Sequence, residues 1–233
     1  AVERLLRLGK GKPVEVGCQL RAHPGLIALK DLLQKRDGPR PFTYRLVMGH
    51  RLDAWRTGQD YRRSYSSRSD RGGGALFDLI HQIDLALWFF GPVELVNAVL
   101  SNVSDLEIHG DDVANLLLTH ASGVTGHIQL DMCSPVHRCE AEVITSESVY
   151  RWSNADGKLR KFSPDSEDVI QEVLPGFERN DLFLKIMEHF LKHLDDPLLP
   201  AFCSLESGAE ALKVALGARK SHARGKAYKL GKS

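Results

Sequence analysis

The chain has 233 residues, of which 42% are hydrophobic and 26% are charged, a composition typical of globular proteins. Its formal net charge of +1 gives no long-range field, which argues against nucleic acid or a membrane surface as a partner. No apolar run is long enough to span a bilayer, and basic residues interrupt the leucines at the start. We therefore expect a cytoplasmic protein.

The first residues look like the end of another domain. Residues 2–8 are typical of the last turns of a helix, and residues 14–18 predict a short buried strand. No strand leads through a G-x-G-x-x-G turn into a helix, which is the unit that binds a dinucleotide. We interpret residues 1–23 as the remnant of an N-terminal Rossmann domain and residues 24–233 as a second, complete domain.

A basic and aromatic stretch follows a predicted helix (residues 24–34) and a predicted strand (residues 42–48). Between residues 40 and 71 there are eight arginines but three aspartates, with Trp55, Tyr61 and Tyr65 among them. One interpretation is a solvated loop. The other is one side of a substrate-binding cleft, because guanidinium groups bind carboxylates or phosphates and aromatic rings stack on sugars.

The next stretch predicts one continuous helix that carries polar residues beside the core. Asp78, His81 and Asp84 are spaced three apart, which places them on one stripe of a helix whose other positions are apolar. Two carboxylates near the imidazole predict that its charged form is favoured and that it exchanges a proton near neutral pH. Residues 72–74 are glycines, and their free amides would favour an anion or a polar ligand oxygen. The alternative is that His81 has no chemical role and makes its hydrogen bonds near the core, and that the glycines form a flexible turn.

The remaining chain predicts an α+β fold, in which a large, mostly antiparallel open sheet has helices over one face. Four cysteines without a C-x-x-C pair are expected to stay reduced and packed. His189 and His193 have a zinc-ligand spacing but no third ligand, so we expect a solvated face and no metal site. The predicted strands are residues 95–103, 113–120, 124–132, 138–145, 148–152, 159–162 and 226–230, and the predicted helices are residues 177–194 and a last helix capped by Ser204 and closed by Gly225.

Two stretches carry a resemblance to a known family. Residues 61–91 read YRRSYSSRSDRGGGALFDLIHQIDLALWFFG, and residues 16–24 read VGCQLRAHP. Both resemble the glucose-fructose oxidoreductase/inositol dehydrogenase (Gfo/Idh/MocA) family, in the branch associated with nucleotide-sugar and sialic-acid-type pathways. The first resembles the signature of the family's C-terminal domain, and the second resembles its V-G-Y-N-x-R-x-H-P junction.

The resemblance implies roles for residues of this chain. It implies that His81 is the general acid/base and that Asp78 orients it or contacts a substrate hydroxyl. A sugar-type substrate would lie against a further set of residues: Asp84, Tyr61, Arg62, Arg63, Trp55, Arg21 and His23. Homodimers or larger assemblies through the sheet face are also expected.

The resemblance also implies an NAD or NADP cofactor in the full-length protein. Cys18 and Gln19 stand where the family usually has Tyr and Asn near the nicotinamide, so we expect no cofactor on this chain and no cofactor contact other than Gln19. The chain alone is then expected to be inactive. Two functions stay open, namely the substrate domain of a sugar or cyclitol oxidoreductase and a non-catalytic sugar-binding or dimerisation module.

Overall fold

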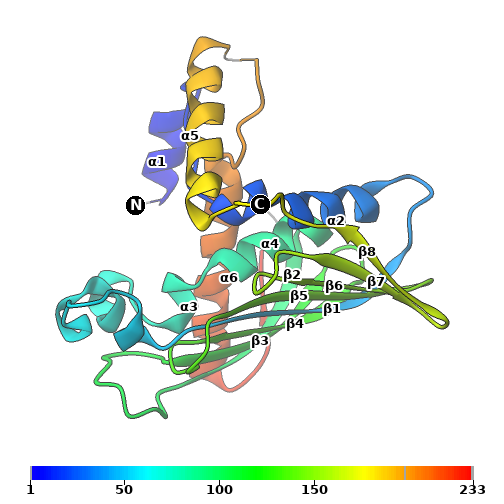
Figure 1. Cartoon of the computed structure of the whole chain (residues 1–233). Coiled ribbons are helices and arrows are strands. Elements are labelled where there is room, and N and C mark those ends of the chain that lie inside the picture. Colours follow the sequence, from blue (N-terminus) through cyan, green and yellow to red (C-terminus); the bar gives the residue numbers. More distant parts are fainter. Residues whose placement is uncertain (1, 197, 232–233) are drawn as a thin grey trace.

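The computed structural model describes residues 2–196 and 198–231, and a broad, twisted sheet forms its base (Figure 1). The strand order is β8-β7-β6-β5-β1-β4-β3-β2-β9. Neighbouring strands pair antiparallel, except that β1 and β4 are parallel. The strands are β1 (Pro41–Gly49), β2 (Val93–Ser101), β3 (Val113–His120), β4 (Thr125–Asp131), β5 (Arg138–Thr145), β6 (Val149–Ser153), β7 (Leu159–Ser163), β8 (Ser166–Gln171) and β9 (Tyr228–Lys229).

Side-chain alternation gives the sheet one buried face. In β3, Ala114, Leu116 and Leu118 are fully buried, whereas Leu117 between them is exposed. Leu116 pairs with Ile128 of β4, which is also buried, so the core continues from strand to strand. This alternation is the reason that the sequence pattern located the strands.

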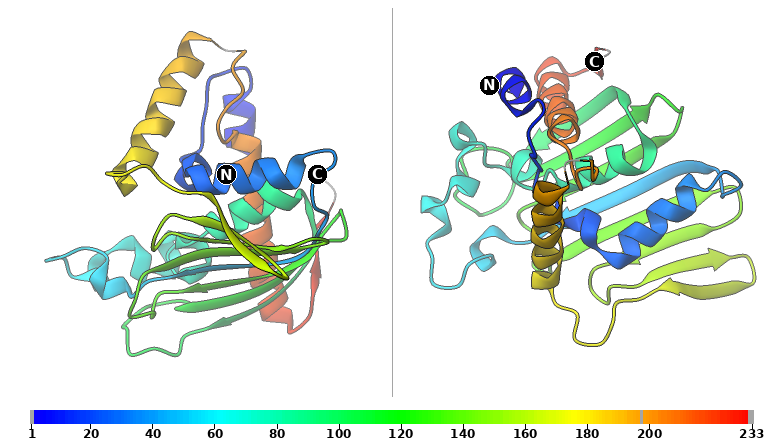
Figure 2. Two further views of the ribbon diagram at one scale, coloured as in Figure 1. Left: turned by 45° about the vertical axis from the view of Figure 1, so that its right-hand side comes forward. Right: turned by 90° about the horizontal axis from the view of Figure 1, so that it is seen from above.

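Helices cover that face, as both views of Figure 2 show. From α2, Leu26 and Leu29 enter the core, and Ile83 and Ala86 enter it from α4. No helix in the described ranges is long and apolar enough to cross a bilayer. The predicted α+β class with helices on one face is confirmed. The helices are α1 (Val2–Gly9), α2 (Pro24–Gln34), α3 (Ala75–Asp78), α4 (His81–Phe90), α5 (Arg179–Asp195) and α6 (Leu205–Arg224).

The helix predicted around His81 is broken, which corrects the continuous stripe. Leu79 leaves the helical conformation (φ −99°, ψ 28°), so α3 ends at Asp78 and α4 begins at His81. Leu79 and Ile83, at and after the break, are both buried. The three polar residues therefore do not share one straight helix face.

The strand predicted at residues 14–18 is also wrong. This segment lies outside the sheet, and the Val16 amide donates a hydrogen bond to the Cys203 carbonyl (2.8 Å). The edges of the sheet belong to β8, which the sequence did not predict, and to β9. The division into residues 1–23 and 24–233 stays a prediction, and residues 1, 197, 232 and 233 lie outside the described part.

Candidate functional site

A carboxylate with one free oxygen lies at the end of α3. The Tyr65 hydroxyl donates a hydrogen bond to Asp78 Oδ1 (2.8 Å). The second oxygen, Oδ2, is buried and has no hydrogen-bond partner among the described residues. A buried acceptor without a partner is costly, so this oxygen is ready to accept a hydrogen bond from a ligand.

His81 begins α4, three residues after this carboxylate, and it is half-buried. Burial lowers its pKa, and this effect outweighs the carboxylates of Asp84 and Asp78, which raise it; the Arg179 charge lowers it further. The prediction that the charged form is favoured is therefore wrong. The imidazole is neutral at pH 7, and a neutral imidazole can accept a proton.

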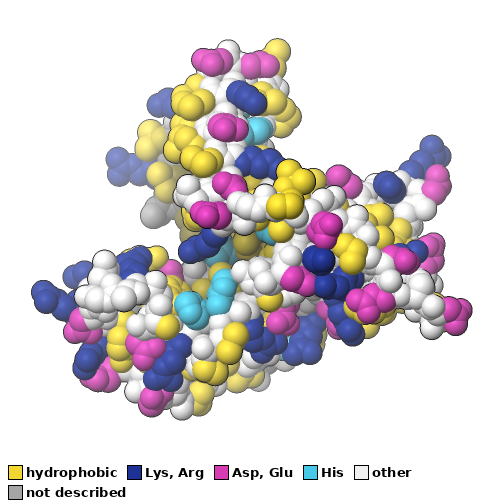
Figure 3. Space-filling model, viewed as in Figure 1, with side chains coloured by type: hydrophobic (Ala, Val, Ile, Leu, Met, Phe, Trp, Pro, Cys, Tyr) yellow, Lys and Arg dark blue, Asp and Glu magenta, His cyan; other side chains and the backbone are white. Residues whose placement is uncertain are grey.

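A hollow of about 320 Å³ lies under the upright helix α5. Asp78 and His81 are not among the residues that line it, and His81 is linked to it through the charge of Arg179. Figure 3 shows histidine side chains gathered in the recess below this helix. Arg179, the first residue of α5, lines the hollow, as does His137 of the β4–β5 connection. The Arg179 charge lowers the pKa of both His81 and His137, so the three groups share one neighbourhood.

Two of the predicted residues at the N-terminal junction also line this hollow. His23 caps α2, because its Nδ1 accepts a hydrogen bond from the Gly25 amide (3.1 Å), and its ring lies edge-on to Trp152 at 4.8 Å. Burial is the main cause that lowers the pKa of His23 to about 4. Gln19 lies in the same wall and is buried.

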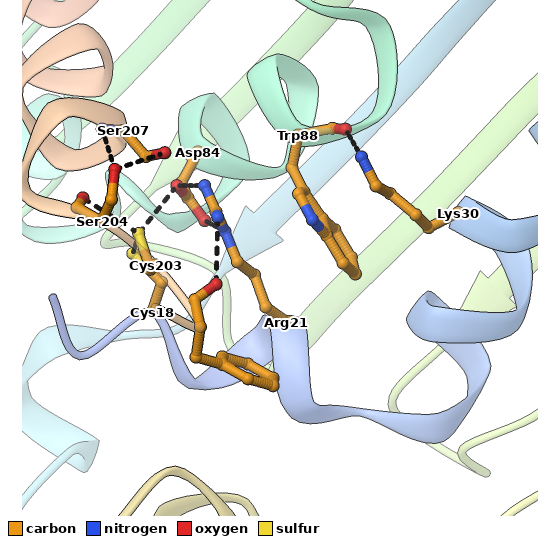
Figure 4. Close-up of polar contacts among 9 residues, drawn as sticks. Cys18, Arg21, Lys30, Asp84, Trp88, Cys203, Ser204 and Ser207 are labelled. Atoms are coloured by element: carbon orange, nitrogen blue, oxygen red, sulfur yellow. Dashed lines mark hydrogen bonds and ion pairs between the residues drawn. The ribbon is translucent and has the colours of Figure 1, made fainter. Parts of the chain in front are cut away.

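Arg21 and Asp84 contact each other rather than the hollow (Figure 4). The Arg21 guanidinium donates two hydrogen bonds to the Asp84 carboxylate, at 2.9 and 2.6 Å, and the side chains are 6% and 3% exposed. Arg21 also lies 5.7 Å from the centre of the Trp88 ring. Both oxygens of Asp84 are therefore occupied by a tie between η1 (Gln19–Ala22) and α4.

The basic loop divides into two parts. Trp55 stacks on His50 at 6.4 Å, and His50 lies 5.1 Å from the His137 ring, so this end of the loop approaches the hollow. At the other end, Arg62 pairs with Glu107 (2.8 Å). The same loop segment has two further predicted residues, Tyr61, whose hydroxyl accepts the Glu107 amide hydrogen bond (3.1 Å), and Arg63, which is exposed.

The glycines before α3 do not form an anion site. The Gly73 amide donates to the Arg68 carbonyl and the Gly74 amide to the Ser66 carbonyl, both at 2.9 Å, and the first helical amides donate to Asp111. A Cβ at Gly73 would lie 2.2 Å from the Tyr65 carbonyl oxygen. The glycines thus allow close approach of two backbones, which corrects the expectation of free amides.

Sequence reasoning missed Tyr65, Arg179 and His137 as members of this neighbourhood. Tyr65 was noted only as one of the aromatic residues of the basic stretch. No local sequence pattern distinguishes Arg179, because its position at the hollow depends on how α5 packs against the rest of the chain. The predicted solvated face at His189 and His193 is also wrong. His189 pairs with Glu15 (2.9 Å), and the ring of His193, which is buried, contacts the Leu199 carbonyl oxygen (2.6 Å).

The described residues contain no pyrophosphate-binding turn of the kind found in dinucleotide-binding domains. Residues 2–196 and 198–231 include no strand that leads through a glycine-rich turn into a helix, and such a turn is what holds a pyrophosphate. The glycines at residues 72–74 follow a run of short 3₁₀ turns, and their amides are already used.

Comparison with known proteins gives concordant matches. Residues 26–151 match the GFO/IDH/MocA C-terminal domain. A D-apiose dehydrogenase from Paraburkholderia graminis is 34% identical over 153 residues, which are 64% of this chain and 37% of that protein. The chain therefore spans well under two thirds of this relative.

Solved structures share the fold. A levoglucosan dehydrogenase in complex with NADH and L-sorbose has a TM-score of 0.84 at 16% identity and covers 100% of this chain, which spans 70% of that protein. An inositol dehydrogenase homologue complexed with NAD⁺ from Azotobacter vinelandii has a TM-score of 0.84 at 13% identity, with coverage of 98% and 68%.

Proposed function

Because the chain belongs to the GFO/IDH/MocA C-terminal domain family, we propose that it is the substrate domain of an NAD(P)-dependent oxidoreductase. The substrate is a sugar, nucleotide sugar or cyclitol that is oxidised at a secondary hydroxyl. The relatives are dehydrogenases named for D-apiose, levoglucosan and inositol, which supports this substrate class. The observation that carries the proposal is the neutral imidazole of His81 three residues from a carboxylate with one free oxygen.

His81 is the proton acceptor in this proposal. Oxidation of an alcohol releases the hydroxyl proton, and a neutral imidazole with no hydrogen bond to another described residue can take it. Asp78 Oδ2 accepts a hydrogen bond from a substrate hydroxyl, while Tyr65 holds Oδ1 and fixes the carboxylate. The guanidinium of Arg179 donates to substrate oxygens at the edge of the hollow.

The oxidation also removes a hydride from the same carbon, and the described residues supply no acceptor for it. We propose that NAD or NADP is held outside these residues and that this chain alone neither binds it nor turns over. Titration with NADH and NADPH, followed by fluorescence, tests this. Micromolar binding to the chain would contradict it.

Substrate binding is tested on the chain itself by NMR. Neutral sugars and cyclitols are titrated while the ring signals of the histidines and of Tyr65 are followed. We expect the signals of His81 and Tyr65 to move, and Asp78→Asn to weaken the effect. Asp53→Asn, an exposed carboxylate outside the site, is the matched control. Shifts that leave His81 and Tyr65 unmoved would contradict the assignment.

The second candidate is a non-catalytic dimerisation module, and the open face of the sheet favours it. Val99, Leu117 and Ile144 are 58%, 53% and 40% exposed and lie on the face opposite the core. We propose a homodimer through this face, which is compatible with either function. Light scattering tests the mass, with Leu117→Arg expected to give a monomer. A wild-type monomer at micromolar concentration would contradict the dimer.

A further inference from the structure

Two cysteines that are distant in sequence lie with their sulfur atoms in contact. Cys18 Sγ and Cys203 Sγ are 3.3 Å apart across 185 positions of the chain (Figure 4). Cys18 is partly exposed, whereas Cys203 is fully buried, and all four cysteines are free thiols. The other two, Cys133 and Cys139, have no cysteine sulfur in contact among the described residues.

The backbone on both sides already holds this pair together. The Val16 amide donates to the Cys203 carbonyl at 2.8 Å, two residues before Cys18. Cys18 immediately precedes η1, which carries Arg21, and Cys203 immediately precedes Ser204, the N-cap of α6. To form a disulfide, the two sulfur atoms must approach from 3.3 Å to about 2.05 Å.

We propose that Cys18 and Cys203 form an intramolecular disulfide when the protein meets a two-electron oxidant of the peroxide class. The sulfur of the partly exposed Cys18 attacks one peroxide oxygen, the O–O bond breaks, and a sulfenic acid forms with release of water. The Cys203 sulfur then displaces the sulfenic oxygen, so that an S–S bond forms and a second water leaves. In total, two thiols and one hydrogen peroxide give one disulfide and two waters.

A metal ion is the competing occupant, because the two sulfur atoms and an Asp84 oxygen all lie within 4.8 Å of one another. Arg21 argues against it. Its guanidinium binds both oxygens of Asp84 and carries a positive charge beside the sulfur atoms, which would repel a cation. Formation of a disulfide needs neither a cation nor a free Asp84 oxygen, so the geometry favours the disulfide.

The disulfide would staple the segment that enters the sheet domain to the start of α6. It would also restrict the movement of η1, which carries Arg21, and so hold the ion pair between Arg21 and Asp84 of α4 in place. The reaction is slow at neutral pH, because the hydrogen bond with Cys203, burial and the Asp84 charge raise the pKa of Cys18, and the thiolate is the reactive form. The bond is thus a slow structural lock rather than a fast sensor.

The test exposes the native chain to hydrogen peroxide for hours at pH 8. We expect the number of free thiols to fall by two and the mass to fall by that of two hydrogen atoms. A cross-linked peptide that joins Cys18 to Cys203 should appear. Dithiothreitol should reverse all three changes. Because the bond closes a long loop, the oxidised protein should melt about 10 °C higher than the reduced protein.

Two variants separate the outcomes. Cys133→Ser, which removes a thiol outside the pair, should keep the cross-link, whereas Cys18→Ser should lose it and the rise in Tm. Four intact thiols after exposure, or a cross-link through Cys133 or Cys139, would overturn the proposal. Stoichiometric zinc binding that protects both Cys18 and Cys203 from peroxide would also overturn it, in favour of a metal site.

Discussion

Replacing Asp84 by Asn should destabilise the fold strongly, because it leaves a buried guanidinium without a counter-charge. Arg21 and Asp84 are 6% and 3% exposed, and two hydrogen bonds of 2.9 and 2.6 Å join them. Removing one partner of a buried ion pair typically costs about 3–5 kcal/mol. Replacing both, as in Arg21→Met with Asp84→Leu, removes both charges and should recover most of that loss.

Urea unfolding followed by circular dichroism measures these free energies. The control is Asp60→Asn, which breaks an exposed pair with Arg62 and should cost less than about 1 kcal/mol. The opposite pattern would refute the reasoning. If Asp84→Asn kept the wild-type free energy of unfolding but abolished sugar binding, Asp84 would be a substrate contact, as the family resemblance implies, rather than part of a structural tie.

Three further predictions follow from the contacts. NMR titration of His81 should give a pKa below 6.5, and a higher value would show that the carboxylates outweigh burial. The pKa of His23 is lowered to about 4 in the fold, so the unfolded chain binds more protons and stability falls as pH drops from 6.5 to 4, by at most about 3 kcal/mol. Urea unfolding of His23→Asn, which can still cap α2, should lose this part of the acid sensitivity, and an unchanged profile would contradict it. Gly126→Ala should cost about 1–3 kcal/mol, because its Cβ would lie 2.2 Å from the Tyr44 ring; Gly17→Ala, with open space around it, should be near neutral by the same assay.

Most of the fold could be predicted because the sheet has one buried face. Residues 113–120 alternate in the sequence and form β3 with these same bounds. Residues 14–18 have a similar apolar character, but a strand also needs a free sheet edge, and Val16 lies against the loop at Cys203 instead. The local sequence pattern predicts the conformation that a segment favours, whereas the assembled sheet decides which segment it pairs with.

The two central residues of the candidate site could be proposed from the sequence, whereas the residues around them could not. The carboxylate and the imidazole at residues 78 and 81 share a motif, so the sequence shows both. Tyr61 and Tyr65 are the same residue type in one loop, and only the turns η3 (Tyr61–Arg63) and η4 (Tyr65–Ser67) decide that Tyr65 reaches Asp78. Arg179 is a hundred residues away, and its place at the hollow depends on how α5 packs.

Burial explains why His81 stays neutral although a carboxylate lies three residues to either side of it in the sequence. The carboxylates of Asp78 and Asp84 both favour the charged form of the imidazole. In the folded chain, Tyr65 holds one carboxylate, and the guanidinium of Arg21 offsets the charge of Asp84. Burial and the positive charge of Arg179 then prevail, and the pKa falls. A proton acceptor must be unprotonated before its substrate binds, so a neutral imidazole is the form that the role proposed for His81 requires.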